Sequence, residues 1–311
     1  MSLKVLRSGL NTTFQDLGRP NYYHLGIPFS GAMDSRNFLI TNKLLSNSLN
    51  DAVLEFAYQG PKLLINEQKV NCVVAGNVNF LIKKSSKIFK GECYKTFELN
   101  KDDEVDIIST INSVYGYFSV SGGFELKKIW GSYSTHVKSE LGPNNGKKII
   151  QGDNLLINKK LTSNYQKKIN FLNRKIEFIR VIKGTNFDFF SDESKNYFFN
   201  SSFEVTNLTD RMGMRLDGYK LKNLKNGNIK SEGLVKGVIQ VPPDGRPIIM
   251  LSDHGTIGGY PKIGVIISAD YNKIVQLPPS SKIKFKLVDI FEAEKLFKLY
   301  SIETKNILNQ I

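Results

Sequence analysis

Strand-like runs dominate the pattern of hydrophobic and polar positions along the chain. Short β-branched or alternating segments recur between clusters of Gly, Asn, Asp and Ser, as is typical of strands joined by turns. In the first half these segments are residues 3–7, 53–58, 62–65, 70–75, 78–83, 94–99, 104–109 and 115–121. In the second half they are residues 176–182, 203–206, 235–241, 248–251, 264–269 and 282–289. Strands spaced this closely and evenly predict barrels or sandwiches rather than alternating βαβ units.

Helical periodicity is confined to three segments. Residues 34–46 are the clearest, because Asp34 is a suitable N-cap and apolar residues follow at helical spacing. Residues 187–198 carry a weaker pattern. Residues 291–311 have a broad apolar stripe and predict an amphipathic helix at the end of the chain.

The strand-rich regions flank a polar, lysine-rich segment at 162–175. Such a segment is a candidate linker between domains. We therefore expect two β domains of similar size, 1–161 and 176–311.

Composition narrows the classes of function. The 311 residues carry a formal net charge of +14, but lysine supplies 35 of the 43 basic residues, largely as scattered pairs. A nucleic-acid-binding protein more often concentrates arginines and aromatic residues along one element, so we expect no nucleic-acid partner. No apolar stretch reaches the length of a membrane span, and the first residues lack the apolar core of a signal peptide. The expected compartment is the cytoplasm.

Metal and phosphate motifs are weak. The two cysteines, Cys72 and Cys93, form no Cys-x-x-Cys pair, and the three histidines are scattered, so we expect no metal site. The segment 142–148 resembles a phosphate loop, but it is one residue short and lacks the Ser or Thr. We interpret it as a turn.

The arginines are more informative than the lysines. In a chain that uses lysine by default, an arginine marks a position where a planar guanidinium is needed. Four of the eight, Arg19, Arg211, Arg215 and Arg246, fall in dense loop segments. Each one either binds an anionic ligand or pairs with a structural carboxylate, and the sequence leaves both open.

Candidate chemistry collects in these segments. Asp16 and Arg19 share a turn at 13–19, and the glycine-rich segment 26–34 leads to the predicted helix start at Asp34, which suits an anion. In the second half, a loop at 253–262 places Asp253, Thr256 and other polar residues beside glycines that permit unusual backbone conformations.

Six motifs resemble one known family. They are Gln-Asp-Leu-Gly-Arg at 15–19, Ser-Gly-Ala-Met-Asp at 30–34, Arg-Met-Gly-Met-Arg-Leu at 211–216, Ser-Glu-Gly at 231–233, Ile-Gln-Val-Pro-Pro-Asp-Gly at 239–245 and Gly-Gly-Tyr-Pro-Lys at 258–262. Together they resemble the allophanate hydrolase subunit 2 family, also called the biotin-dependent carboxyltransferase family. It includes the C subunit of bacterial 5-oxoprolinase and KipA-like regulators, and the resemblance covers about residues 3 to 287.

The resemblance implies a mainly β fold of two cyclophilin-like β-barrel domains with a few helices. It also implies partners: a KipI-like subunit 1, which is the B subunit of 5-oxoprolinase, and the A subunit of that enzyme. The expected function is ATP-dependent conversion of the amide 5-oxoproline to glutamate, with ATP and Mg²⁺ held by the complex. The alternatives are the carboxyltransferase component of a urea carboxylase or urea amidolyase, which uses biotin, and KipA-like regulatory binding without catalysis.

Roles for the site residues follow as a hypothesis. Asp253 and Glu232 orient a nucleophile or hold Mg²⁺, while Lys262 meets phosphate. Arg211 and Arg215 clamp anionic oxygens. The other expected substrate-binding residues are Asp16, Arg19, Asp34, Thr256, Gly258, Gly259 and Tyr260. Asp16 and Arg19 alternatively form a structural pair.

Two expectations complete the hypothesis. The groups converge at one cleft on a pair of barrels. The chain departs from the family at three positions. The family usually has arginine in place of Tyr133, commonly has an acid in place of His136 and frequently has glutamine in place of His254. These departures bear on the substrate more than on the fold.

Overall fold

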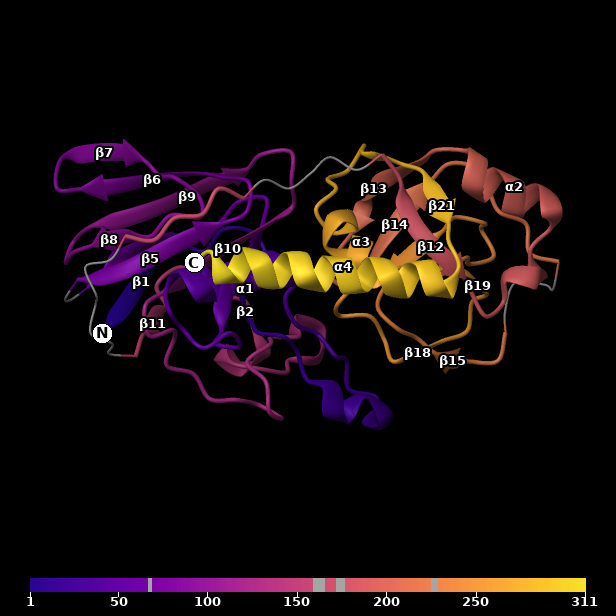
Figure 1. Cartoon of the computed structure of the whole chain (residues 1–311). Coiled ribbons are helices and arrows are strands. Elements are labelled where there is room, and N and C mark those ends of the chain that lie inside the picture. The colour runs from indigo at the N-terminus through magenta and orange to yellow at the C-terminus, as the bar shows by residue number, and fades with distance from the viewer. Residues whose placement is uncertain (67–68, 159–165, 172–176, 225–228) are drawn as a thin grey trace. The chain divides into compact units, whose positions relative to one another are not determined.

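The computed structural model describes residues 1–66, 69–158, 166–171, 177–224 and 229–311. The chain divides into two compact units (Figure 1). Unit 1 comprises Met1–Arg19, Ser30–Leu172 and Thr304–Ile311, and unit 2 comprises Pro20–Phe29 and Asn173–Glu303. The expected linker at 162–175 lies largely outside the described residues, so the expected domain boundaries stay a prediction.

Within the described residues, unit 1 holds two antiparallel sheets around a shared core. One sheet has the order β11 (Asn154–Leu156), β1 (Ser2–Arg7), β4 (Lys62–Ile65), β9 (Glu104–Thr110), β6 (Val78–Lys84) and β7 (Lys87–Lys90). The other has the order β2 (Thr13–Gln15), β3 (Val53–Ala57), β10 (Tyr115–Val120), β5 (Val70–Ala75) and β8 (Phe97–Leu99). Buried side chains such as Leu3, Phe56, Phe80 and Phe118 come from both sheets and form one hydrophobic cluster.

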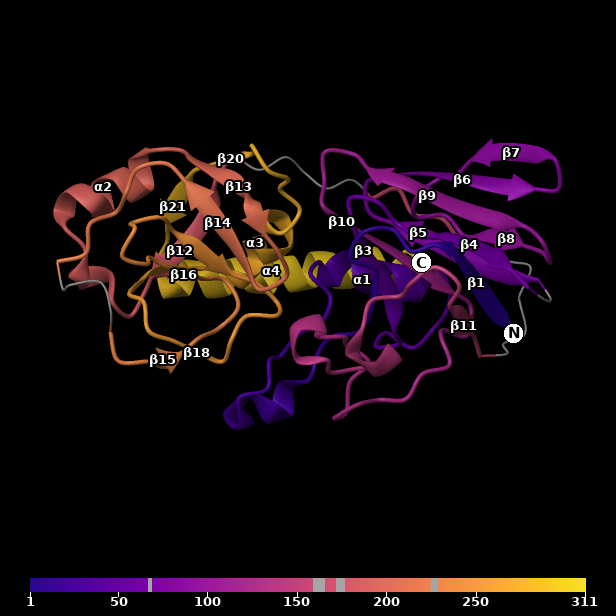
Figure 2. The same cartoon turned by 180° about the vertical axis from the view of Figure 1, so that it is seen from behind.

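Helix α1 (Ser35–Leu44) packs against β3, β5 and β10 of the second sheet (Figure 2). Asp34 caps it by accepting a hydrogen bond from the N–H of Asn37, as predicted. Because α1 covers one face of β10 and the core covers the other, all six residues of β10 are buried. The short 3₁₀ turns η2 (Val137–Ser139) and η3 (Asn144–Gly146) also lie in this unit.

Unit 2 is built on a sheet that closes on itself. In the described part of the chain its order is β20 (Lys282–Ile283), β13 (Phe203–Thr209), β14 (Gly213–Asp217), β17 (Ile248–Met250), β16 (Val238–Gln240), β19 (Lys262–Ile266), β12 (Ile179–Lys183) and β21 (Phe285–Leu287). The two end strands are consecutive in sequence and only Lys284 separates them (Figure 2). One stretch of backbone therefore pairs with β13 on one side and with β12 on the other, which closes a barrel.

Unit 2 contains five further elements or pairs of elements in the described residues besides α4. They are η1 (Pro20–Leu25), η4 (Phe187–Phe189), α2 (Asp192–Asn200), α3 (Ser268–Ile274) and the hairpin of β15 (Glu232–Gly233) with β18 (Ile257–Gly258). The last helix is α4 (Ile290–Asn309). Its residues up to Glu303 belong to unit 2, and those from Thr304 onward belong to unit 1.

The predicted fold class is confirmed: the chain is mainly β with a few helices. Three details of the sequence interpretation are wrong. The helix expected at 187–198 begins only after Ser191, which caps α2. The strand expected at 264–269 ends at Ile266 and gives way to α3. Arg215, expected in a loop segment, lies on strand β14, which begins at Gly213.

Candidate functional site

A bidentate ion pair joins Arg211 to Asp253 in unit 2. Nε and Nη2 of Arg211 donate to the two carboxylate oxygens of Asp253 over 2.8 and 2.9 Å. Arg211 precedes β14 and Asp253 follows β17, and these strands are hydrogen-bonded neighbours, so sheet pairing brings the two residues together. The side chains are only 11% and 7% exposed. Arg211 is therefore paired with a carboxylate of the chain itself, and the predicted clamp of Arg211 and Arg215 on a ligand stays a prediction.

A second pair joins Lys262 on β19 to Glu232 on β15. Nζ of Lys262 donates to Oε2 of Glu232 over 2.6 Å. The Lys262 side chain is 4% exposed, whereas the Glu232 side chain is 43% exposed. The hydrogen bond from Lys262 holds the pKa of Glu232 below its ordinary value. Glu232 is thus an ionised carboxylate with one side open to solvent.

The loop at 253–262 carries one member of each pair, one at each end. The segment after β15 holds this loop: the N–H of Leu234 donates to the carbonyl of Thr256 over 2.9 Å, and β18 of the loop pairs with β15. A Cβ at Gly258 would lie 2.5 Å from Nε2 of Gln240, so a larger residue there would require the Gln240 side chain to move. Gln240 also donates to the carbonyl of Tyr260.

The predicted site residues of unit 2 therefore meet on this loop and its partners. Asp253, Thr256, Gly258, Gly259, Tyr260 and Lys262 lie on the loop, while Arg211 and Glu232 pair with its two ends. Arg215 is exposed on β14 between the buried side chains of Met214 and Leu216.

Tyr23 of η1 contacts this loop and was not among the residues predicted from the sequence. Its hydroxyl donates to the carbonyls of Thr256, over 3.1 Å, and Leu234. Tyr23 therefore helps to hold the same loop from a segment more than two hundred residues away in sequence.

Asp16 and Arg19 lie in unit 1 and are both almost fully buried. Asp16 accepts hydrogen bonds from the hydroxyls of Ser132 and Ser134 over 2.7 and 2.6 Å, and from the N–H of Tyr133 over 2.7 Å. Arg19 donates through Nη2 to the carbonyl of Ser134. Both residues therefore hold the loop at 132–134, and their expected roles stay a prediction.

Asp34 is the centre of a buried network in unit 1. Its N–H donates to the hydroxyl of Tyr117 over 2.7 Å, and that hydroxyl donates to Glu55 over 2.9 Å. Burial and the neighbouring Glu55 and Asp34 carboxylates raise the pKa of Tyr117 well above its ordinary value, so it stays a hydroxyl. The sequence analysis missed Glu55 and Tyr117. Their signal is a carboxylate and a hydroxyl inside otherwise apolar strands.

Arg19 belongs to unit 1, whereas Arg211, Asp253 and Lys262 belong to unit 2. The expectation of one shared cleft stays a prediction. Among the residues that the structure describes, no group of three or more His, Cys, Asp or Glu side chains is arranged to hold a metal ion. No helix of the described ranges is long and apolar enough to cross a membrane.

A family model described as "Carboxyltransferase domain, subdomain A and B" matches residues 25–287. The chain belongs to this carboxyltransferase-domain family. The matched range of the family contains both ion pairs of unit 2 and Asp34, and it begins after Asp16 and Arg19. The family resemblance inferred from the six motifs is therefore confirmed.

Relatives within the carboxyltransferase-domain family carry two kinds of name. The chain is 30% identical to the C subunit of 5-oxoprolinase from Escherichia coli (strain K12), over 94% of this chain and 93% of that protein. It is 27% identical to urea amidolyase of Lachancea kluyveri, over 95% of this chain but 17% of that protein. The crystal structure of K. lactis urea amidolyase superposes with a TM-score of 0.88 at 26% identity, over 98% of this chain and 20% of that chain.

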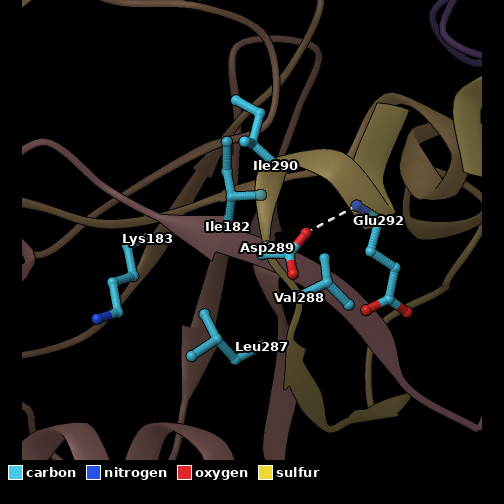
Figure 3. Close-up of a pocket in the computed structure, with 7 residues that line it drawn as sticks. All are labelled: Ile182, Lys183, Leu287, Val288, Asp289, Ile290 and Glu292. Carbon is cyan, nitrogen blue, oxygen red and sulfur yellow. Dashed lines mark hydrogen bonds between the residues drawn. The ribbon is translucent and has the colours of Figure 1, made fainter. Parts of the chain in front are cut away.

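One surface pocket lies elsewhere in unit 2 of this carboxyltransferase-domain protein. It has a volume of about 550 Å³ and is lined by Ile182, Lys183, Leu287, Val288, Asp289, Ile290 and Glu292 (Figure 3). Its Asp289 accepts a hydrogen bond from the N–H of Glu292 over 2.8 Å, at the start of α4. None of the predicted site residues lines this pocket, and one of its two carboxylates, Asp289, already accepts a hydrogen bond at the start of α4.

Proposed function

We propose that this chain is the C-type subunit of an ATP-dependent 5-oxoprolinase, which converts 5-oxoproline to glutamate together with A and B subunits. The observation that carries the proposal is the 30% identity to the C subunit of a 5-oxoprolinase, over 93% of that relative's length. The B subunit is the KipI-like partner. The proposed compartment is the cytoplasm, which supplies ATP.

The chemistry calls for charge neutralisation and positioning. The ring amide of 5-oxoproline is a poor electrophile, so ATP supplies a phosphoryl group that activates its oxygen before water opens the ring. In our proposal, Lys262 neutralises anionic oxygens, with the backbone of Gly258 and Gly259 beside it. The buried Lys262 ammonium suits this role because low local polarity strengthens its field.

The two carboxylates have different capacities. Mg²⁺ in nucleotide sites is often held by one or two carboxylates plus phosphate oxygens and water. Glu232 fits such a ligand, since its side chain is 43% exposed. Asp253 has both oxygens bonded to Arg211, so we assign it the orientation of Arg211 instead. The proposed substrate-facing set otherwise keeps Arg211, Arg215, Thr256 and Tyr260 of unit 2.

A second candidate function is carboxyl transfer from biotin to urea. It is supported by the family description and by the superposition on K. lactis urea amidolyase over 98% of this chain. The chain spans about a fifth of that enzyme. We prefer the first function because the chain matches the 5-oxoprolinase subunit over 93% of that protein's length.

Co-expression with A and B subunits tests the proposal. The expected result is ATP-dependent release of glutamate from 5-oxoproline, and its loss in Lys262→Ala but not in the exposed control Lys87→Ala. Carboxylation of urea from carboxybiotin without glutamate release would favour the second function. Tight binding to the B subunit with no turnover by the full assembly would overturn both in favour of regulation.

A further inference from the structure

Strand β12 leaves the sheet close to the point where Lys262 begins β19. The pairing of β12 with β19 ends with Lys183 opposite Gly264. The next residue, Gly184, still donates its N–H to the carbonyl of Ile263 over 3.1 Å. A Cβ at Gly184 would lie 2.2 Å from the carbonyl oxygen of Lys262, a backbone atom, so this close approach requires glycine. The two residues after Gly184 are thereby brought against Lys262.

Asn186 pairs with both backbone groups of Lys262. Its N–H donates to the carbonyl of Lys262 over 3.3 Å, and its Oδ1 accepts from the N–H of Lys262 over 3.1 Å. Asn186 is 5% exposed, so these bonds are shielded from water. The residue thus takes the place in the ladder that a continued β12 would have filled.

The side chain of Asn186 does not serve its own helix. Asn186 is the N-cap of η4, and asparagine is among the residues that best cap a helix through a side-chain oxygen. It makes no such cap hydrogen bond. Its oxygen accepts instead from Lys262, which is 76 residues away in sequence. The side chain therefore acts on Lys262 and not on the start of η4.

Thr185 completes the network at the charged end of Lys262. Its hydroxyl lies 3.3 Å from Oδ1 of Asn186 and 3.4 Å from Oε2 of Glu232. The same Oε2 accepts from Nζ of Lys262 over 2.6 Å. These contacts form a ring that starts at the backbone of Lys262 and returns to its ammonium.

We propose that Asn186 is a positioning residue for the Lys262 ammonium, and this rests on the proposed function. A cation stabilises developing negative charge most when it is already in place. A displacement of about 1 Å costs about 100-fold in rate. Lysine carries its charge on a flexible stem, so the place of the ammonium depends on where the backbone is fixed. Asn186 fixes that backbone and does not itself touch the substrate.

The variant Asn186→Ala tests this role in the assembled enzyme. We expect kcat to fall about 10- to 100-fold with little change in KM, because the cation is present but misplaced. In the background Lys262→Met the same change should have no further effect on kcat, because Asn186 acts through Lys262. A residue needed only for folding would lower activity by the same factor in both backgrounds. The matched control, Asn207→Ala at an exposed asparagine of β13, should leave kcat unchanged in both.

A second measurement is independent of turnover. Hydrogen exchange of the isolated chain, followed by NMR, should show the Lys262 amide exchanging about 10-fold faster in Asn186→Ala, the factor that one lost hydrogen bond implies. Asn186→Asp keeps an accepting oxygen and should restore the protection. The amide of Ile266, which donates to the carbonyl of Gly237 over 2.9 Å, is the internal reference and should not change.

Each outcome decides a separate point. An equal loss of kcat in both backgrounds, or unchanged exchange of the Lys262 amide, overturns the inference. If Asn186→Ala does not fold, Thr185→Val at an exposed position decides instead. It should lower kcat several-fold in the wild-type background and not in Lys262→Met, and any other result overturns the inference. A wild-type assembly without 5-oxoprolinase activity defeats the proposed function, and the rate effect assigned to Asn186 with it, even where exchange behaves as expected.

Discussion

The two ion pairs of unit 2 differ in how far their charges are removed from water. Arg211 and Asp253 are both nearly buried, whereas Glu232 of the second pair is open to solvent. Removing one member of a buried pair leaves the other without compensation, while a solvated carboxylate tolerates the loss of its partner. Truncation of one member should therefore affect stability in the first pair and chemistry in the second.

Arg211→Ala should lower the free energy of unfolding by about 3–5 kcal/mol, because the buried Asp253 would lose both hydrogen bonds from the guanidinium. Urea unfolding followed by circular dichroism measures the change. The double variant Arg211→Ala with Asp253→Ala removes both charges and should regain part of the loss. A single variant within about 0.5 kcal/mol of wild type would show that Asp253 finds other compensation.

Lys262→Met should leave the free energy of unfolding within about 1 kcal/mol of wild type, because methionine fills the buried space and Glu232 remains hydrated. Turnover of the assembled enzyme should nevertheless fall by about 100-fold or more, since a preorganised cation is lost. Steady-state rates and thermal unfolding of the same preparation check both parts. Unchanged turnover would remove Lys262 from the site.

The sequence pointed to all four charged residues of these pairs, but not to which of them pair. Arg211 and Lys262 were visible because each stands in a glycine-rich motif of a chain that otherwise scatters lysine. Their carboxylates lie 42 and 30 residues away, and only strand pairing brings them together. Glu55 and Tyr117 were missed for a similar reason, because 62 residues separate the two partners of that buried bond.

At the scale of elements, the sequence predicted the start of a helix correctly where a capping residue was present. Asp34 marked the start of α1, and the structure confirms it. Helix α3 has no side-chain cap hydrogen bond, and it follows a β-branched strand directly, so periodicity alone merged it with that strand. Tertiary contacts anchor α3 instead. Asp270 is fully buried and accepts from Nε and Nη2 of Arg180 on β12 over 2.8 and 2.6 Å.

This anchor should make stability depend on pH. Burial alone would raise the pKa of Asp270, but hydrogen bonds from Arg180 and Lys273 hold it below its ordinary value near 3.8. The unfolded chain then binds the proton at higher pH than the folded chain. The contribution is fully present above the unfolded pKa and is lost as pH falls through the folded pKa.

Asp270→Asn removes the titrating group. At pH 7 it should lower the free energy of unfolding by about 2 kcal/mol, the size of a hydrogen bond to a charged group. Denaturation curves between pH 3 and 7 should show a smaller acid loss in the variant than in the wild type. Parallel curves for the two proteins would place the acid sensitivity elsewhere.

For the whole molecule, the spacing of the strands in the sequence predicted the class of fold. It did not predict how the barrel of unit 2 closes. Residues 282–289 were expected to form one strand. In the structure this segment contains the two end strands of one sheet: β20 pairs with β13, and β21 pairs with β12. A change of partner at Lys284 has no local sequence signal, because both halves alternate in the same way. Closure follows from pairing between residues that are distant in sequence.

Phe285 provides the test of that closure. Its ring is 2% exposed on β21 and stacks on Phe198 of α2 with centroids 4.6 Å apart. Phe285→Ala should lower the free energy of unfolding by about 3–5 kcal/mol through the cavity it leaves. Because the hydrophobic cluster of unit 1 contains no residue of β21, hydrogen exchange should accelerate in β12 and β13 and stay unchanged in β5 and β10. Equal acceleration in both sets of strands would instead show that the two units unfold as one cooperative body.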